Sequence, residues 1–154
     1  YNEREIVRLA DACRRTGHEF LFEIISGNNG KAAAPDQILS LMQRYYDLGV
    51  APDWWKLEPI EDTGFWTAAG DVVRANDPHL QGIIVLGKEM PKEHLCRVLA
   101  IARTEPLVNG FAIGRTIFSK AAQAWFAGEI DDNAAQQMMT AVYGQLIDAW
   151  DNAA

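Results

Sequence analysis

The sequence predicts an α/β fold with four parallel strands, each followed by a helix, and one extra C-terminal helix. Four short apolar runs begin at positions 20, 54, 82 and 110, and segments of helical periodicity separate them. Short strands that are apolar on both faces and joined through single helices are typical of parallel sheets. A complete (β/α)8 barrel needs about 250 residues. The chain has 154, so we expect a single domain over residues 1–154, the C-terminal half of such a barrel.

The first half of the chain supplies two strands and their helices. A helix is predicted over 2–15, which Thr16-Gly17 ends, and the run at 20–25 is the first strand. Pro35 is typical of a helix start, so the next helix begins there and Gly49 ends it. The second strand covers 54–58, because Pro59 cannot continue a strand pairing. A third helix follows and ends near 76–78.

The second half repeats this alternation. The third strand covers 82–87, and a helix begins at Pro91. The fourth strand covers 110–114, a helix follows around 118–125, and Asp131 precedes the extra helix. A small doubly wound sheet would accept the same units. We favour the half barrel because the helix at 2–15 looks like the end of a preceding strand–helix unit.

A half barrel would expose two strand edges and an apolar interior, which soluble proteins avoid. We therefore expect a missing N-terminal barrel half, or another copy of the chain, to cover it. The chain also begins with Tyr1 rather than Met, which suggests a fragment or a processed product.

Charge and composition limit the partners. The chain has 14 Lys and Arg against 21 Asp and Glu, a net charge of −7, which argues against binding nucleic acid or an anionic membrane. No apolar run approaches the roughly 18 residues of a membrane span. Cys13 and Cys96 have no metal or redox spacing, so a reduced, cytoplasmic protein is expected. The three histidines, His18, His79 and His94, fall before strands or inside a helix, away from the C-terminal ends of the strands, and no metal cofactor is expected.

Lys56 is unusual because it lies inside an apolar strand, with Trp54 and Glu58 on the same face. A buried ammonium is costly unless it is paired or loses its proton. An unprotonated lysine amine can attack a carbonyl and form a Schiff base. The alternative is a structural ion pair of Lys56 with Glu58 or Glu23, and spacing alone slightly favours that alternative.

Glu23 lies near the C-terminal end of the first strand, where the active sites of parallel α/β proteins gather. A carboxylate one strand away from Lys56 can move protons during imine formation and carbon–carbon cleavage. It can equally serve as the partner that keeps Lys56 charged. Both roles need the same proximity, so the sequence leaves the two open.

Two Gly-cation pairs follow the last two strands. Gly114-Arg115 precedes a helix, where an arginine and the helix N-terminus can hold phosphate, and Gly87-Lys88 is in the equivalent place one strand earlier. A turn glycine with a solvated arginine is an equally good interpretation. The loop at 27–31 resembles a phosphate loop only superficially, and we interpret it as a flexible loop.

The runs DWWKLEP at 53–59, GFAIGRTIF at 110–118 and GEIDD at 128–132 resemble one known family. It is the aldolase-like domain, formerly described only as a domain of unknown function, that is often fused behind the sugar kinase of bacterial inositol catabolism. It is similar to class I aldolases of the tagatose-bisphosphate type, which are (β/α)8 barrels. The resemblance covers nearly the whole chain and corresponds to the second half of the barrel.

The resemblance implies roles for four of the candidate residues. Lys56 matches the Schiff-base lysine of the sixth strand, Glu23 the acid/base glutamate of the fifth, and Gly114-Arg115 the phosphate-binding end of the eighth. The candidate substrate-binding residues are Gly87, Lys88, Gly114, Arg115 and Glu58.

The implied reaction is a metal-independent cleavage of 2-deoxy-5-keto-gluconate 6-phosphate to dihydroxyacetone phosphate and malonate semialdehyde. The alternative is a catalytically silent domain, attached to a carbohydrate kinase, that binds a sugar phosphate or regulates the kinase.

Overall fold

The strands form one parallel sheet in the order β1-β2-β3-β4, which is also their order along the chain. The computed structural model describes residues 3–26 and 34–152. Over these residues the elements are α1 (Glu3–Thr16), β1 (Leu21–Glu23), α2 (Pro35–Asp47), β2 (Trp54–Leu57), α3 (Thr63–Asn76), β3 (Gly82–Leu86), α4 (Lys92–Ala102), β4 (Val108–Ala112), α5 (Arg115–Phe126) and α6 (Asp132–Asp151). The predicted fold class is confirmed.

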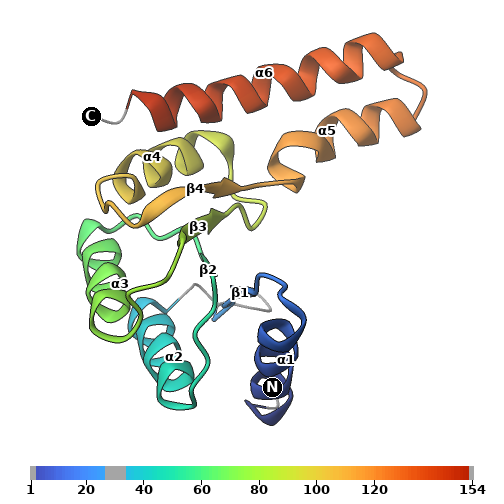
Figure 1. The fold of residues 1–154 in the computed structure, drawn as a ribbon. Coiled ribbons are helices and arrows are strands. Elements are labelled where there is room, and N and C mark those ends of the chain that lie inside the picture. The colour runs from blue at the N-terminus through green and yellow to red at the C-terminus, as the bar shows by residue number, and fades with distance from the viewer. Residues whose placement is uncertain (1–2, 27–33, 153–154) are drawn as a thin grey trace.

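The helices lie in an arc outside the strands, and the other side of the sheet is open (Figure 1). A doubly wound sheet would reverse its strand order at a switch point and carry helices on both faces. Neither feature is present in the described part of the chain, so the half-barrel arrangement holds. The long helix α6 lies across α4 and α5, as expected for the extra C-terminal helix.

The hydrophobic core lies between the sheet and this arc of helices. Side chains alternate along β2, so that Trp55 and Leu57 point toward the helices and are fully buried. The ring of Trp55 stacks on Phe22 of β1, with centroids 5.2 Å apart. On the open face, Leu21 is 46% exposed and Ile25 is 51% exposed. That face therefore keeps apolar surface in contact with solvent.

β2 and β3 each end one residue earlier than predicted, and the other two strands differ more. Strand pairing in β1 covers three residues, although the amide of Ile24 still donates to the carbonyl of Lys56 at 3.0 Å. β4 begins and ends two residues earlier than predicted. A register shift lies beside Asn109, whose side chain donates to the carbonyl of Gln81 at 2.6 Å. A polar residue at an irregular position interrupts the apolar pattern, which explains the misplaced start.

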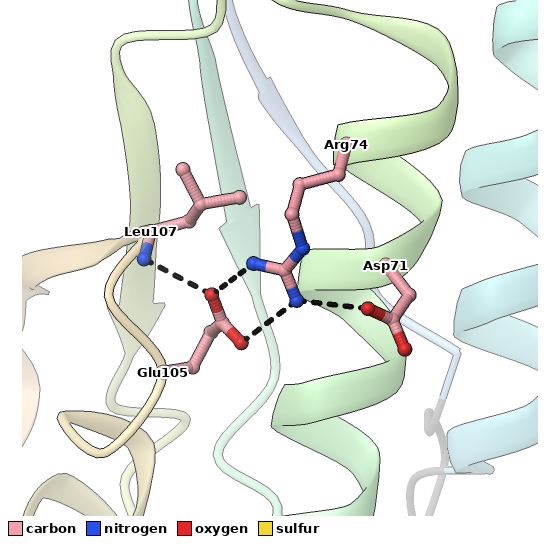
Figure 2. A network of polar contacts seen from close by, with 4 residues as sticks. All are labelled: Asp71, Arg74, Glu105 and Leu107. Carbon is pink, nitrogen blue, oxygen red and sulfur yellow. Dashed lines mark hydrogen bonds and ion pairs between the residues drawn. The ribbon is translucent and has the colours of Figure 1, made fainter.

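A charged network stabilises the sheet at the N-terminal ends of the strands (Figure 2). Glu105, which is 5% exposed, accepts hydrogen bonds from Arg74 of α3 at 2.7 and 3.3 Å and from the amide of Leu107 at 3.2 Å. Arg74 also contacts Asp71 at 2.9 Å. Bonding to Glu105 and then to Asp71 raises the pKa of Arg74 above its usual value. This network lies at the end of the sheet opposite to the candidate site.

Among the helices that the structure describes, none is long and apolar enough to cross a membrane.

Candidate functional site

A pocket of about 240 Å³ lies at the C-terminal ends of the strands. Six of the seven candidate site residues line it: Glu23, Lys56, Gly87, Lys88, Gly114 and Arg115. Ile25, Leu86, Glu89, Ala112, Thr116 and Phe118 complete the lining. Because parallel strands end at the same edge of a sheet, residues from four separate parts of the sequence meet there.

Lys56 and Glu23 form the centre of the pocket. The strand register pairs Glu23 with Lys56, so both side chains project from the same row of the open face. The Nζ atom of Lys56 lies 3.0 Å from Oε1 of Glu23. The two side chains are 23% and 39% exposed, so the pair is partly shielded but reachable by a ligand. This distance allows direct proton transfer, and it also fits a structural ion pair.

Gly87, Lys88 and Glu89 form a tight turn after β3. A side chain at position 87 would meet Ile113, since a Cβ atom there would lie 2.9 Å from its Cγ2. Lys88 and Glu89 have φ values of +48° and +56°, in the left-handed region that non-glycine residues seldom adopt. Such a backbone persists only where its surroundings hold it, and it is common at ligand-binding sites.

Arg115 is the first residue of α5, and Gly114 caps that helix. A Cβ atom at Gly114 would lie 3.0 Å from the ring of Phe118, so glycine lets the ring approach the strand end. The guanidinium of Arg115 forms an ion pair with Glu89, and the Arg115 side chain remains 64% exposed. Arg115 lies at a helix N-terminus and lines the same pocket as Lys56. A cation in this position is suited to an anionic group such as phosphate.

Glu58 is the candidate residue that does not line the pocket. It lies just beyond the end of β2 and is fully buried. One carboxylate oxygen accepts from the amide and the hydroxyl of Ser26, at 2.7 and 2.6 Å, and the other pairs with Lys88. Of the two ion pairs considered for Lys56, the structure therefore forms the one with Glu23.

Sequence reasoning missed Glu89 and Ser26. Glu89 follows Gly87-Lys88 directly, but only the left-handed turn brings its carboxylate to Arg115. Ser26 directly follows the first predicted strand, and a hydroxyl at the C-terminal end of a strand could have indicated a site residue. The loop at 27–31, interpreted as flexible, lies outside the described residues.

Metal ligands do not gather in the described part of the chain, where no three His, Cys, Asp or Glu side chains are placed to hold an ion. Metal independence stays a prediction. A larger hollow of about 630 Å³ lies at the other ends of the strands, lined in part by Arg14, His18, Asp53 and His79. In barrels that end contributes to stability, whereas catalytic groups gather at the C-terminal ends, so the smaller pocket is the better candidate.

Comparisons with known proteins agree with the fold. The family described as "Uncharacterized protein conserved in bacteria (DUF2090)" matches residues 1–154. No curated protein matches the chain in sequence. Among solved structures, the fructose-bisphosphate aldolase from Plasmodium falciparum, in complex with TRAP and a small molecule inhibitor, superposes with a TM-score of 0.64 at 12% identity. The match covers 97% of this chain and 48% of the aldolase chain, so the chain spans about half the length of that structure.

Proposed function

The chain belongs to the DUF2090 family, and we propose that it supplies the catalytic half of a metal-independent class I aldolase, an aldehyde-lyase. The observation that carries the proposal is the 3.0 Å contact between Lys56 Nζ and Glu23 Oε1 in a pocket that also holds Arg115. A nucleophilic amine, a proton acceptor and an anion-binding cation are the groups that this reaction needs.

The reaction begins when Glu23 takes a proton from the Lys56 ammonium, and the free amine adds to the ketone of the substrate. Glu23 returns the proton to the carbinolamine hydroxyl, which leaves as water and gives an iminium ion. Glu23 then takes the proton from the hydroxyl on the β carbon, two carbons away from the iminium carbon, and the bond between that β carbon and the α carbon breaks. The electrons of that bond pass to the iminium, which becomes an enamine, and the β carbon leaves as an aldehyde. Glu23 returns its proton to the α carbon of the enamine, and water hydrolyses the resulting iminium ion to release the ketone product and Lys56.

The substrate we propose is a phosphorylated keto sugar acid, 2-deoxy-5-keto-gluconate 6-phosphate. Cleavage yields dihydroxyacetone phosphate and malonate semialdehyde, and no oxidant or reductant is consumed. The exposed guanidinium of Arg115 at the start of α5 supports a phosphate at this end of the pocket. The substrate and its place in cytoplasmic inositol catabolism, beside a fused sugar kinase, rest on the sequence resemblance.

The other half of the barrel is part of the proposal. The exposed Leu21 and Ile25 on the open face, and the 48% coverage of the aldolase structure, support an additional barrel half in the native protein. It would come from a preceding segment or from a second copy of the chain. Residues from its strands would complete the substrate site.

The alternative function is a silent domain that binds a sugar phosphate or regulates a kinase. The ion pair between Lys56 and Glu23 is consistent with this alternative, because each charge has a partner even if Lys56 never reacts with a ligand. The two functions differ in one outcome, because only the aldolase forms a covalent bond between its ligand and Lys56.

The test is borohydride reduction of the native full-length protein in the presence of dihydroxyacetone phosphate, followed by peptide mass spectrometry. We expect the ketone to be trapped on the peptide containing Lys56. Lys56→Arg, which keeps the charge but is a far weaker nucleophile, should give no adduct, and EDTA should not change the yield. An adduct on another lysine, or loss of the adduct with EDTA, would contradict the proposal. Binding of dihydroxyacetone phosphate without an adduct would favour the silent domain.

A further inference from the structure

Glu58 joins the loops that follow three neighbouring strands. It follows β2 itself, it accepts two hydrogen bonds from Ser26, which lies after β1, and it pairs with Lys88, which lies after β3. The hydroxyl of Ser26 also accepts from the amide of Ala34 at 3.0 Å, immediately before α2. One buried carboxylate therefore connects the end of β1, the start of α2 and the turn after β3.

The burial of Glu58 makes these contacts strong. A carboxylate removed from water is costly unless it is hydrogen-bonded and paired, and charge-assisted bonds in such surroundings are stronger than neutral ones. Glu58 is 0% exposed, and both of its oxygens have partners from other loops. Moving any of these loops would leave the carboxylate incompletely satisfied.

The turn after β3 needs such an anchor. Lys88 and Glu89 adopt left-handed backbone conformations, which surrounding contacts must hold. The pair with Glu58 fixes Lys88, and the adjacent Glu89 contacts Arg115. The position of the turn therefore determines how Lys88 and Glu89 border the pocket.

We propose that Glu58 is a positioning residue. It holds the turn after β3, which contains Lys88, and through this turn it shapes the part of the pocket near Arg115 where the phosphate would bind. It acts without touching the ligand, since it does not line the pocket. The identity of the ligand as a phosphate rests on the proposed function, whereas the connection between the loops does not. Chemistry at Lys56 should depend little on Glu58, because Lys56 has Glu23 as its partner.

The test uses Glu58→Gln in the native full-length protein. Glutamine keeps the size of the side chain and can still accept from Ser26, but it has no charge for Lys88. We expect the dissociation constant for inorganic phosphate to rise about tenfold and amide exchange at Ser26 and Ala34 to become about tenfold faster. The yield of the borohydride adduct on Lys56, with saturating dihydroxyacetone phosphate, should stay the same.

The matched control is Glu61→Gln. Glu61 is three residues further along, is partly exposed and pairs with Arg97 and His94 on α4, so the same charge is removed away from the pocket. If Glu58→Gln and Glu61→Gln have the same dissociation constant for phosphate and the same exchange rates at Ser26 and Ala34, the inference is overturned. Should Glu58→Gln fail to fold by circular dichroism, Ser26→Ala provides the test. It should speed exchange at Ala34 and weaken phosphate binding about threefold, and unchanged values would overturn the inference.

Failure of the two proposals can be distinguished. If the wild-type protein forms no adduct on Lys56, the aldolase proposal fails, while phosphate binding and amide exchange still decide the role of Glu58. If the adduct forms and Glu58→Gln behaves like Glu61→Gln, only the inference about Glu58 fails. If the adduct forms but the wild-type protein does not bind inorganic phosphate, the aldolase proposal stands and the inference about Glu58 fails.

Discussion

Replacing Glu23 with glutamine should slow imine formation at Lys56 by 10²- to 10⁴-fold, the usual contribution of a positioned general base. Glu23 Oε1 lies 3.0 Å from Lys56 Nζ, so a proton can pass between them directly. Glutamine fits the same space and can keep a hydrogen bond, but its amide does not take up a proton at neutral pH. The substitution therefore removes proton transfer and retains the contact.

The effect on stability should be small. The Glu23 side chain is 39% exposed and the Lys56 side chain 23% exposed, and partly exposed ion pairs contribute about 0.2–1 kcal/mol. The free energy of unfolding should thus change by no more than about 1 kcal/mol. A large loss of rate with the fold intact separates a catalytic role from a structural one.

The assay measures how fast borohydride traps dihydroxyacetone phosphate on Lys56 at pH 7, by intact mass. Glu23→Asp withdraws the carboxylate by roughly 1.5 Å, one carbon–carbon bond, and should give an intermediate rate. Glu89→Gln is the matched control, because Glu89 lines the same pocket but pairs with Arg115. A trapping rate for Glu23→Gln within threefold of wild type, or an equal loss in Glu89→Gln, would refute the reasoning.

Two further predictions concern the fold. Gly70→Ala should lower the free energy of unfolding by about 1–3 kcal/mol, since a Cβ atom there would lie 2.5 Å from the carboxylate of Glu105, which Arg74 holds in place. Gly144→Ala, where nothing lies within 4 Å, should instead stabilise its helix by about 1 kcal/mol in urea unfolding, and equal effects at both positions would contradict the clash. Burial raises the pKa of Tyr46 to about 12, so stability should fall from pH 10 to 12, where the unfolded chain loses the phenol proton before the folded protein does. Tyr46→Phe should reduce that pH dependence in unfolding titrations, and an unchanged slope would contradict it.

The sequence predicts the positions of β2 and β3 well because nearly continuous apolar runs, bounded by Gly and Pro, leave little choice. The start of β4 could not be predicted in the same way. Its pairing passes through Asn109, and the side chain of Asn109 bonds to the carbonyl of Gln81, immediately before β3, at the register shift. Tertiary contacts of this kind override local apolar patterns.

In the candidate site, too, one contact could be predicted from the sequence and another could not. Proximity of Lys56 and Glu23 follows from sequential parallel strands, because residues near the strand ends fall in one row. The partner of Glu58 does not follow from spacing, since the pair with Lys88 depends on the left-handed turn after β3. A turn of non-glycine residues with positive φ carries no reliable sequence signal.

The charges in the pocket explain why chemistry and binding should respond to different substitutions. Each cation that lines the described pocket lies against a carboxylate: Lys56 with Glu23, Lys88 with Glu58, and Arg115 with Glu89. Glu58 is fully buried, whereas Glu89 is 56% exposed and its pair with Arg115 is of the weak, solvent-screened kind. An incoming phosphate can therefore displace Glu89 from Arg115 at little cost, while the Lys88–Glu58 pair stays in place. Substitution of Glu23 should then lower the rate of the covalent step, and substitution of Glu58 should lower the affinity for phosphate.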